Sequence, residues 1–248
     1  MRIKPSSRRA RGRPARVPER DAREALLDAA VALFAERGVA ATTAAGIASR
    51  AGVTPAMVHY YFRGRERLLD AVVDERMSRF VANVFGAPLD PAAPIATAIA
   101  TIAGRIFDTA RMMPWMPRIW IREIAAEGGL LRERAIKHLP LAAVDGLVAR
   151  VQAAQRRGEI AAGIEPRIVL VSMLGLTLFP LATEPLWRRL PGADKLTPAD
   201  LQRHATALLT AGLAGATAAP PGAKRVRAPH ATARSRRRAA APRHRKHA

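Results

Sequence analysis

A short stretch after residue 53 gathers side chains that can make several kinds of contact. Thr54, His59 and Tyr60 offer a hydroxyl, an imidazole and a phenol, and each of these groups can form hydrogen bonds. Pro55 and Ala56 are small and apolar, so a partner surface can approach them closely. This mixture suits the base edges and phosphates of a DNA groove, and it offers no acid–base pair for bond-breaking chemistry.

The rest of the chain lacks the side-chain groupings that catalysis or metal binding requires. His59, His138 and His204 fall in separate predicted helices, and the other histidines lie beyond residue 218. No glycine-rich phosphate-binding loop occurs. The absence of cysteine excludes disulfides and thiolate metal ligands and fits a reducing cytosol. We therefore expect a protein that is not an enzyme and that has no cofactor and no metal site.

The elements that would position the polar stretch are short helices with clear boundary residues. Apolar residues recur at helical spacing from Asp21 onward, and Gly38 is typical of the residue that ends a helix. Thr42 and Thr43 can cap a second helix over 44–50. A third helix over 55–61 begins with Thr54 as the cap and Pro55 in the first turn.

Gly52 lies in the tight turn between the second and third helices, where a positive φ favours glycine. Gly64 then precedes a longer helix predicted over 65–84. Two short helices joined by such a turn form a helix-turn-helix. Small apolar residues are predicted to fix it against the first helix: Ile47, Ala48, Val53, Val58 and Leu68.

The run TTAAGIASRAGVTPAMVHYYFRGRERLL, within about residues 21–75, resembles the DNA-binding segment of the tetracycline-repressor (TetR) family. Many positions agree with the family pattern in register: Thr42, Thr43, Ile47, Ala48, Ala51, Gly52, Val53, Thr54, Val58, Tyr61, Phe62 and Leu68. Three depart from it: His59 replaces a tyrosine that contacts phosphate, Gly64 a polar cap, and Arg65 a lysine.

The resemblance implies two kinds of DNA contact. It places Thr43, His59, Tyr60 and Arg65 at the phosphate backbone, and Thr54, Pro55 and Ala56 at base edges. Thr43 and Thr54 also fit a purely capping role, and His59 fits a partly buried spacer. Tyr61 and Phe62 are expected in the core, whereas Met57 fits either a thymine methyl contact or a surface position.

The net charge of +21 is concentrated at the two ends of the chain. Residues 1–20 carry +7 and residues 219–248 carry +10, which leaves +4 for the residues between them. Both ends are too polar to bury a core, so we expect them to be disordered and to bind nucleic acid. Arg11 and Arg13, in Arg-Gly-Arg-Pro, could enter a minor groove, although a merely solubilising leader remains an alternative.

Beyond residue 88 the pattern predicts helices at about 92–111, 115–127, 130–157, 166–182 and 198–216. The stretch from Ile168 to Ala182 is the most apolar and is too short to span a membrane, which favours a cytoplasmic protein with no membrane partner. Family resemblance implies that the last two helices form a homodimer, and their apolar faces, which include Leu208 and Leu213, are suited to it. Packing within one subunit is the alternative.

A cluster of methionine and aromatic residues could line a pocket for an apolar or aromatic effector: Met112, Trp115, Met116, Ile119, Trp120 and Arg122. Ordinary core packing is the alternative, and it is the more common role of such a stripe. Arg122 and Glu123 could orient a ligand, but a structural ion pair or a solvated face is the more common role of such residues.

These observations predict an all-α protein with about nine helices: an N-terminal three-helix helix-turn-helix domain followed by a helical ligand-binding and dimerisation domain. The expected segments are a basic arm at 1–20, a DNA-binding domain at 21–68, an effector-binding and dimerisation domain at 69–217, and a basic tail at 218–248. The function expected from the resemblance is a ligand-responsive repressor that binds a palindromic double-stranded DNA operator as a dimer. The alternative is a DNA-coating or compacting protein that uses its basic arms without sequence preference.

Overall fold

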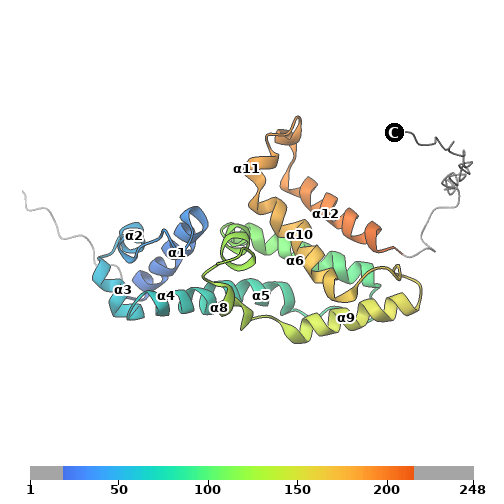
Figure 1. Ribbon diagram of the computed structural model, residues 1–248, viewed down its shortest axis with the longest axis horizontal. Coiled ribbons are helices and arrows are strands. Elements are labelled where there is room, and N and C mark those ends of the chain that lie inside the picture. Colours follow the sequence, from blue (N-terminus) through green and yellow to red (C-terminus); the bar gives the residue numbers. More distant parts are fainter. Residues whose placement is uncertain (1–18, 215–248) are drawn as a thin grey trace, which may run out of the picture. The chain divides into compact units, whose positions relative to one another are not determined.

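The computed structural model describes residues 19–214, and this part of the chain is all helical (Figure 1). It contains no strand, only an isolated bridge between Ile160 and Ala214. The two arginine-rich ends lie outside the described residues, and so do the minor-groove candidates Arg11 and Arg13. The predicted all-α fold is confirmed.

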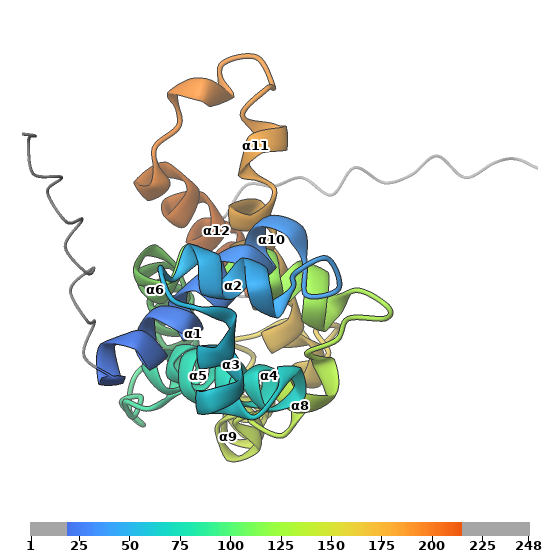
Figure 2. The ribbon, with the colours of Figure 1, turned by 90° about the vertical axis from the view of Figure 1, so that its left-hand side faces the viewer.

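The first three helices form the predicted helix-turn-helix arrangement, at the side that Figure 2 turns toward the viewer. Gly38 ends the first helix with a φ of 85°, and Gly52 forms the turn between the next two with a φ of 70°. The hydroxyl of Thr43 accepts a hydrogen bond from the N–H of Gly46 and so caps the second helix. The bounds are α1 Glu19–Arg37, α2 Ala44–Arg50 and α3 Pro55–Phe62.

A single helical run follows α3, but it is not a uniform α-helix as predicted for residues 65–84. It consists of α4 (Arg65–Val72), a π-helical segment η1 (Val73–Met77) and α5 (Ser78–Phe85). Within η1 the N–H of Ser78 bonds to the carbonyl of Val73, the wider spacing that defines a π turn. Such a turn changes which residues face the core on its two sides.

Among the later helices, the main difference from the prediction is a break near one proline. The stretch 130–157 is not one helix, because it breaks before Pro140, whose ring and missing N–H are incompatible with a helix interior. This break, the division of the run at 65–84 and a short helix at Glu184–Trp187 together give more helices among residues 19–214 than the nine expected. The remaining elements are α6 Ile95–Met112, α7 Met116–Ile119, π-helical η2 Trp120–Ala125, α8 Arg132–Ile136, α9 Leu141–Arg156, η3 Pro166–Ile168, α10 Val169–Ala182, α11 Glu184–Trp187, η4 Ala193–Lys195 and α12 Pro198–Leu213.

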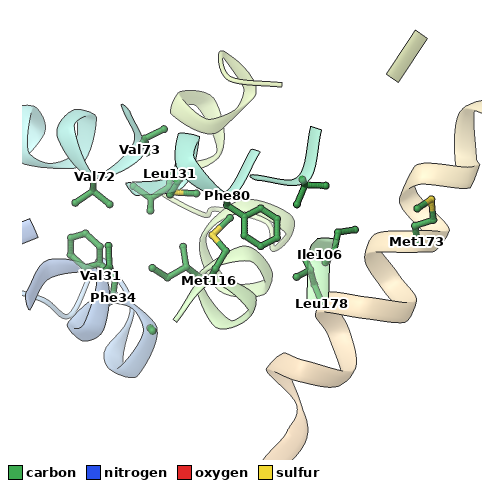
Figure 3. Packing of buried hydrophobic residues seen from close by; sticks show 14 of the residues in the cluster. Val31, Phe34, Val72, Val73, Phe80, Ile106, Met116, Leu131, Met173 and Leu178 are labelled. Atoms are coloured by element: carbon green, nitrogen blue, oxygen red, sulfur yellow. The ribbon is translucent and has the colours of Figure 1, made fainter. Parts of the chain in front are cut away.

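One buried hydrophobic cluster extends across the predicted domain boundary at residue 68. Figure 3 shows Phe34 of α1 close to Val72 of α4, with Met116 and Phe80 beyond them. Helix α1 also contacts α7 directly. The N-terminal helices are thus packed onto the helices that follow them. Among the described residues, no helix has both the length and the apolar character needed to cross a bilayer.

The turn between α1 and α2 is tied down at several points. The hydroxyl of Thr42 donates to the carbonyl of Gly38 at 2.7 Å, and the N–H of Val39 donates to a carboxylate oxygen of Glu123 at 2.9 Å. A Cβ atom added at Gly38 would lie 3.1 Å from both Arg122 Cδ and Glu123 Oε1. This position therefore requires glycine for its positive φ and for the space around it.

We predict that Gly38→Ala lowers the free energy of unfolding by about 1–3 kcal/mol, because alanine is strained at this φ and crowds Glu123. Chemical denaturation of the purified chain measures the change. Gly104→Ala is the matched control, since Gly104 lies inside α6 and its added Cβ would meet only a side-chain atom, at 3.7 Å. That control should be neutral or stabilising by about 0.5–1 kcal/mol, and an equal loss in both variants would contradict the prediction.

Candidate nucleic-acid interface

Helix α3 presents one face to solvent and packs the other onto the protein. Val58 and Phe62 are buried, whereas the side chain of Tyr60 is 64% exposed. The remaining predicted contact residues of this segment are also exposed: Thr54, Pro55, Ala56 and His59. The exposed residues are those that the sequence predicted for DNA contact, and the buried ones fix the orientation of the helix.

The two ends of α3 have different chemical features. Thr54 occupies the N-cap position, but its hydroxyl makes no capping hydrogen bond, so it is available to an outside partner. At the other end Arg63 has a φ of 53° and Gly64 a φ of 135°, which ends α3 and redirects the chain into α4 within two residues. A short, sharply bounded helix of this kind has little freedom to shift along its own axis.

Aromatic side chains pack against one another at the C-terminal end of α3. The rings of Tyr60 and Tyr61 meet edge to face with centroids 5.0 Å apart, and Tyr61 meets Phe62 at 6.3 Å. The guanidinium of Arg23 lies 5.2 Å from the centroid of Phe62. Phe62 is buried and Tyr61 is half-buried against the core, which confirms the structural role expected for both. Met57 is also half-buried against the core.

Arg65, predicted to contact phosphate, is engaged within the protein. One guanidinium nitrogen donates to the carbonyl of Thr42, and the other donates to the carbonyl of Val39 at 2.5 Å. The side chain remains exposed overall, so it can meet an anion while it holds the turn. Thr43, the cap of α2, is exposed directly beyond this turn. Arg65 therefore supports the backbone next to Thr43, and its contact with phosphate stays a prediction.

Glu123 has a structural role that the sequence did not predict. Its side chain is buried, 5% exposed, and takes part in no ion pair with Arg122 among the described residues. It accepts hydrogen bonds from the backbone N–H groups of Val39 at 2.9 Å and Leu130 at 3.3 Å. Since a buried carboxylate requires such donors, Glu123 links η2 to the turn that precedes α2. An ion pair or a solvated face is therefore wrong for Glu123, whereas Arg122 is exposed.

Ion pairs surround the π segment η1. Arg23 of α1 pairs with Glu75 at 2.5 Å, and this hydrogen bond, followed by the Coulombic attraction, lowers the pKa of Glu75. Arg76 is 6% exposed and bonds to Glu24 at 2.7 Å and Asp28 at 2.9 Å. Burial acts to lower the pKa of Arg76, but its hydrogen bonds to the two carboxylates outweigh burial and raise it. Helix α1 is thus held to η1 by charge as well as by apolar packing.

Helix α8 and the turn after it are joined to α4 and η1 in the same way. Arg134 bonds to Asp70 at 2.7 Å and to Glu66 at 2.5 Å, and His138 meets Asp74 at 2.8 Å. Among residues 19–214 no group of three or more His, Asp or Glu side chains is placed to hold a metal ion. The titratable groups in this region therefore form pairs between helices.

The structure does not bring the six predicted effector residues into one cavity. Met112 is 66% exposed, because it ends α6 and points to solvent, and Arg122 is exposed as well. Met116 and Ile119 are fully buried in the core, and Trp115 is half-buried against it. A cavity of about 60 Å³ lies beneath α8, and of the six predicted residues only Met116 and Trp120 line it.

With this geometry in view, comparison with known proteins identifies the segment. Residues 26–72 match the family model described as bacterial regulatory proteins, tetR family. This segment therefore resembles the corresponding segment of tetR-family regulatory proteins. The matched residues run from the core face of α1 through α3 to the end of α4, so they include every exposed residue of the α3 face.

Curated relatives match a limited part of the chain. The HTH-type transcriptional regulator BetI of Rhizobium meliloti (strain 1021) is 36% identical over 72 residues, which is 29% of this chain and 36% of the relative. BetI of Brucella anthropi is 43% identical over 51 residues, 21% of this chain and 26% of the relative. The chain therefore matches about a third or less of the length of these curated relatives.

The fold likeness extends further than the sequence likeness. The ketosteroid transcriptional regulator KstR2 of Mycobacterium tuberculosis superposes with a TM-score of 0.61 at 20% identity, covering 77% of this chain and 94% of that protein. HlyIIR, a hemolysin II transcriptional regulator, gives a TM-score of 0.58 at 18% identity over 79% of this chain and 99% of its own. At these identities the likeness concerns the fold alone, and it extends over most of the chain.

We predict that Arg65→Ala lowers the free energy of unfolding by about 1–3 kcal/mol, because two backbone carbonyls lose charged donors. Denaturant titration without DNA isolates this effect from any contact with phosphate. The control is Arg67→Ala, which removes an exposed arginine from the same helix and should stay within about 0.5 kcal/mol of the parent. A stable Arg65→Ala protein would show that the two carbonyl bonds contribute little.

Proposed function

We propose that the chain is a DNA-binding transcriptional regulator, a repressor that binds a palindromic operator as a homodimer and responds to a small molecule. The observation that supports this most directly is the exposed face of α3. Its buried side is fixed by Val58 and Phe62, while its outer side presents only short or planar groups that fit a groove. The family match covers the same segment.

The division of contacts follows from chemistry and position. The hydroxyl of Thr54 and the small side chains of Pro55 and Ala56 lie in the first turn of α3, where a recognition helix meets base edges. His59 and Tyr60 lie one turn later and are assigned to phosphates, together with Thr43 and Arg65. The arm with Arg11 and Arg13 precedes α1 in the chain and is proposed to reach the adjacent minor groove.

The proposed dimer uses α10 and α12. Each helix packs one face onto the protein, with Met173 and Leu178 buried from α10 and Leu209 from α12. The opposite faces remain apolar and exposed: Val171, Phe179 and Leu208. Two adjacent helices with uncovered apolar faces are well suited to a four-helix contact between subunits.

The alternative, a protein that coats or compacts DNA, draws on the two basic ends. Such a protein would bind through counterion release and would show little preference among sequences. An exposed face on α3 without strong positive charge favours the regulator, because short polar groups discriminate bases but add little nonspecific affinity. The preference between operator and random DNA at fixed salt distinguishes the two functions.

We expect selection from a random DNA pool to yield an inverted repeat that the full chain prefers over random DNA by roughly 10³-fold or more at fixed salt.

Tyr60→Ala should weaken binding to that site by on the order of tenfold, because one exposed phosphate contact is lost. Leu141→Ala, which alters another exposed side chain far along the sequence on α9, should bind as the parent does. A pool that enriches for no sequence would support the coating protein.

We also expect Phe179→Glu to convert the dimer to monomers, because it places a charge in the centre of the proposed apolar interface. Sedimentation equilibrium measures the association state. Leu141→Glu introduces the same charge on α9 and should leave the dimer intact. If Phe179→Glu remained dimeric, the α10–α12 face would not be the interface.

A further inference from the structure

A cavity of about 220 Å³ lies between α5, the connector at 86–94, α6 and α9. None of the residues predicted from sequence to bind an effector contributes to it. Its wall is largely apolar: Val84, Phe85, Pro88, Leu89, Ile102 and Leu147. Two positively charged side chains complete the wall, Arg105 from α6 and Arg150 from α9.

Both arginines are bound only to neutral acceptors. Arg105 donates to the carbonyls of Ala87 at 2.7 Å, Val84 at 3.3 Å and Pro88 at 3.3 Å. Arg150 donates to the carbonyl of Ala93 at 2.8 Å. Neither arginine forms an ion pair with a carboxylate of residues 19–214, although most acids near η1 are paired. Two half-buried guanidinium charges therefore border one apolar cavity without a counter-charge.

We propose that this cavity binds a carboxylate carried on a short or medium apolar chain, and that this ligand is the effector. The apolar wall would remove the chain from water, and the guanidinium groups would form charge-assisted hydrogen bonds with the carboxylate. A volume of about 220 Å³ lies below the range of about 300–1,000 Å³ common for drug-sized ligands, which points to a small molecule. The assignment of the ligand as effector rests on the regulatory function proposed above.

Arg105 also connects the cavity to the DNA-binding segment. Its acceptors, the carbonyls of Val84, Ala87 and Pro88, lie at the C-terminal end of the run α4–η1–α5. A carboxylate that bonds to Arg105 competes with these carbonyls, so ligand binding favours a state in which the end of the run is released. A ligand can shift an equilibrium only through such a difference in affinity. The carboxylate ligand therefore weakens operator binding.

The binding test uses the full chain without DNA. Isothermal titration is carried out with hexanoate, octanoate and decanoate, and separately with the alcohols of the same lengths. At least one acid should bind, with a Kd lower than that of its alcohol by about tenfold or more, the expected effect of a charge-assisted hydrogen bond. The proposal is overturned if no acid binds more tightly than its own alcohol.

Two variants separate the cavity from the general positive charge of the chain. Arg150→Gln should weaken binding of the best acid by about tenfold, because the charged partner of the carboxylate is lost, and should affect binding of the alcohol much less. Arg156→Gln removes an exposed arginine from the same helix, outside the cavity wall, and should bind the acid as the parent does. Equal losses in both variants would overturn the site. A thermal melt of each variant confirms folding.

The DNA measurements are kept separate so that the two proposals fail independently. Operator preference without any ligand tests the regulatory function, whereas acid binding without DNA tests the cavity. Operator affinity in the presence of saturating acid tests the connection through Arg105, and a decrease is expected. An acid that binds in the cavity without changing operator affinity would overturn its role as effector.

Discussion

The α1–α2 turn is the point on which the geometry of the DNA-binding segment depends, and it is held from two directions. The buried carboxylate of Glu123 accepts the N–H of Val39, while Arg65 donates to the carbonyls of Val39 and Thr42. One partner comes from η2 and the other from the start of α4. Helix α2 begins at Ala44, two residues after Thr42. These bonds therefore set the position of α2 and, through the turn at Gly52, the position of α3. A buried charge left without its donors would be strongly destabilising, so this link is expected to be rigid.

The parts of the fold that sequence predicted well are those whose determinants are local. Gly38, Gly52 and the Thr54-Pro55 pair mark helix ends through their own backbone preferences, and each lies at the predicted boundary. The π segment η1 was not predicted, because its residues continue the apolar pattern of the helix around it. The break before Pro140 was not predicted either, because the helical periodicity on its two sides suggests one continuous helix.

In the candidate site, too, sequence predicted the features with local determinants and not those that depend on distant residues. The exposed face of α3 was predictable because its pattern within eight residues separates buried from outward positions. Glu123 was not, since its partner Val39 is 84 residues away in the sequence and an acid beside an arginine indicates a surface pair. The methionine and tryptophan cluster was recognised as apolar, but sequence does not show whether an apolar face meets a core, a cavity or solvent. Arg105 and Arg150 come from different helices and share a cavity only after folding.

The helical run from Arg65 to Phe85 connects helix α3 with the proposed effector cavity. At its start two residues with positive φ, Arg63 and Gly64, join it directly to α3, and at its end its carbonyl groups bond to Arg105. Between them, ion pairs hold η1 to α1, and Arg134 holds α4 to α8. A helix transmits displacement along its axis more readily than a loop does, because its backbone hydrogen bonds resist compression. In a dimer, the distance between two α3 helices must match the spacing of successive major grooves. A small shift at the Arg105 end of both runs would therefore be sufficient to disturb that match, and local rearrangement of α3 itself would not be required.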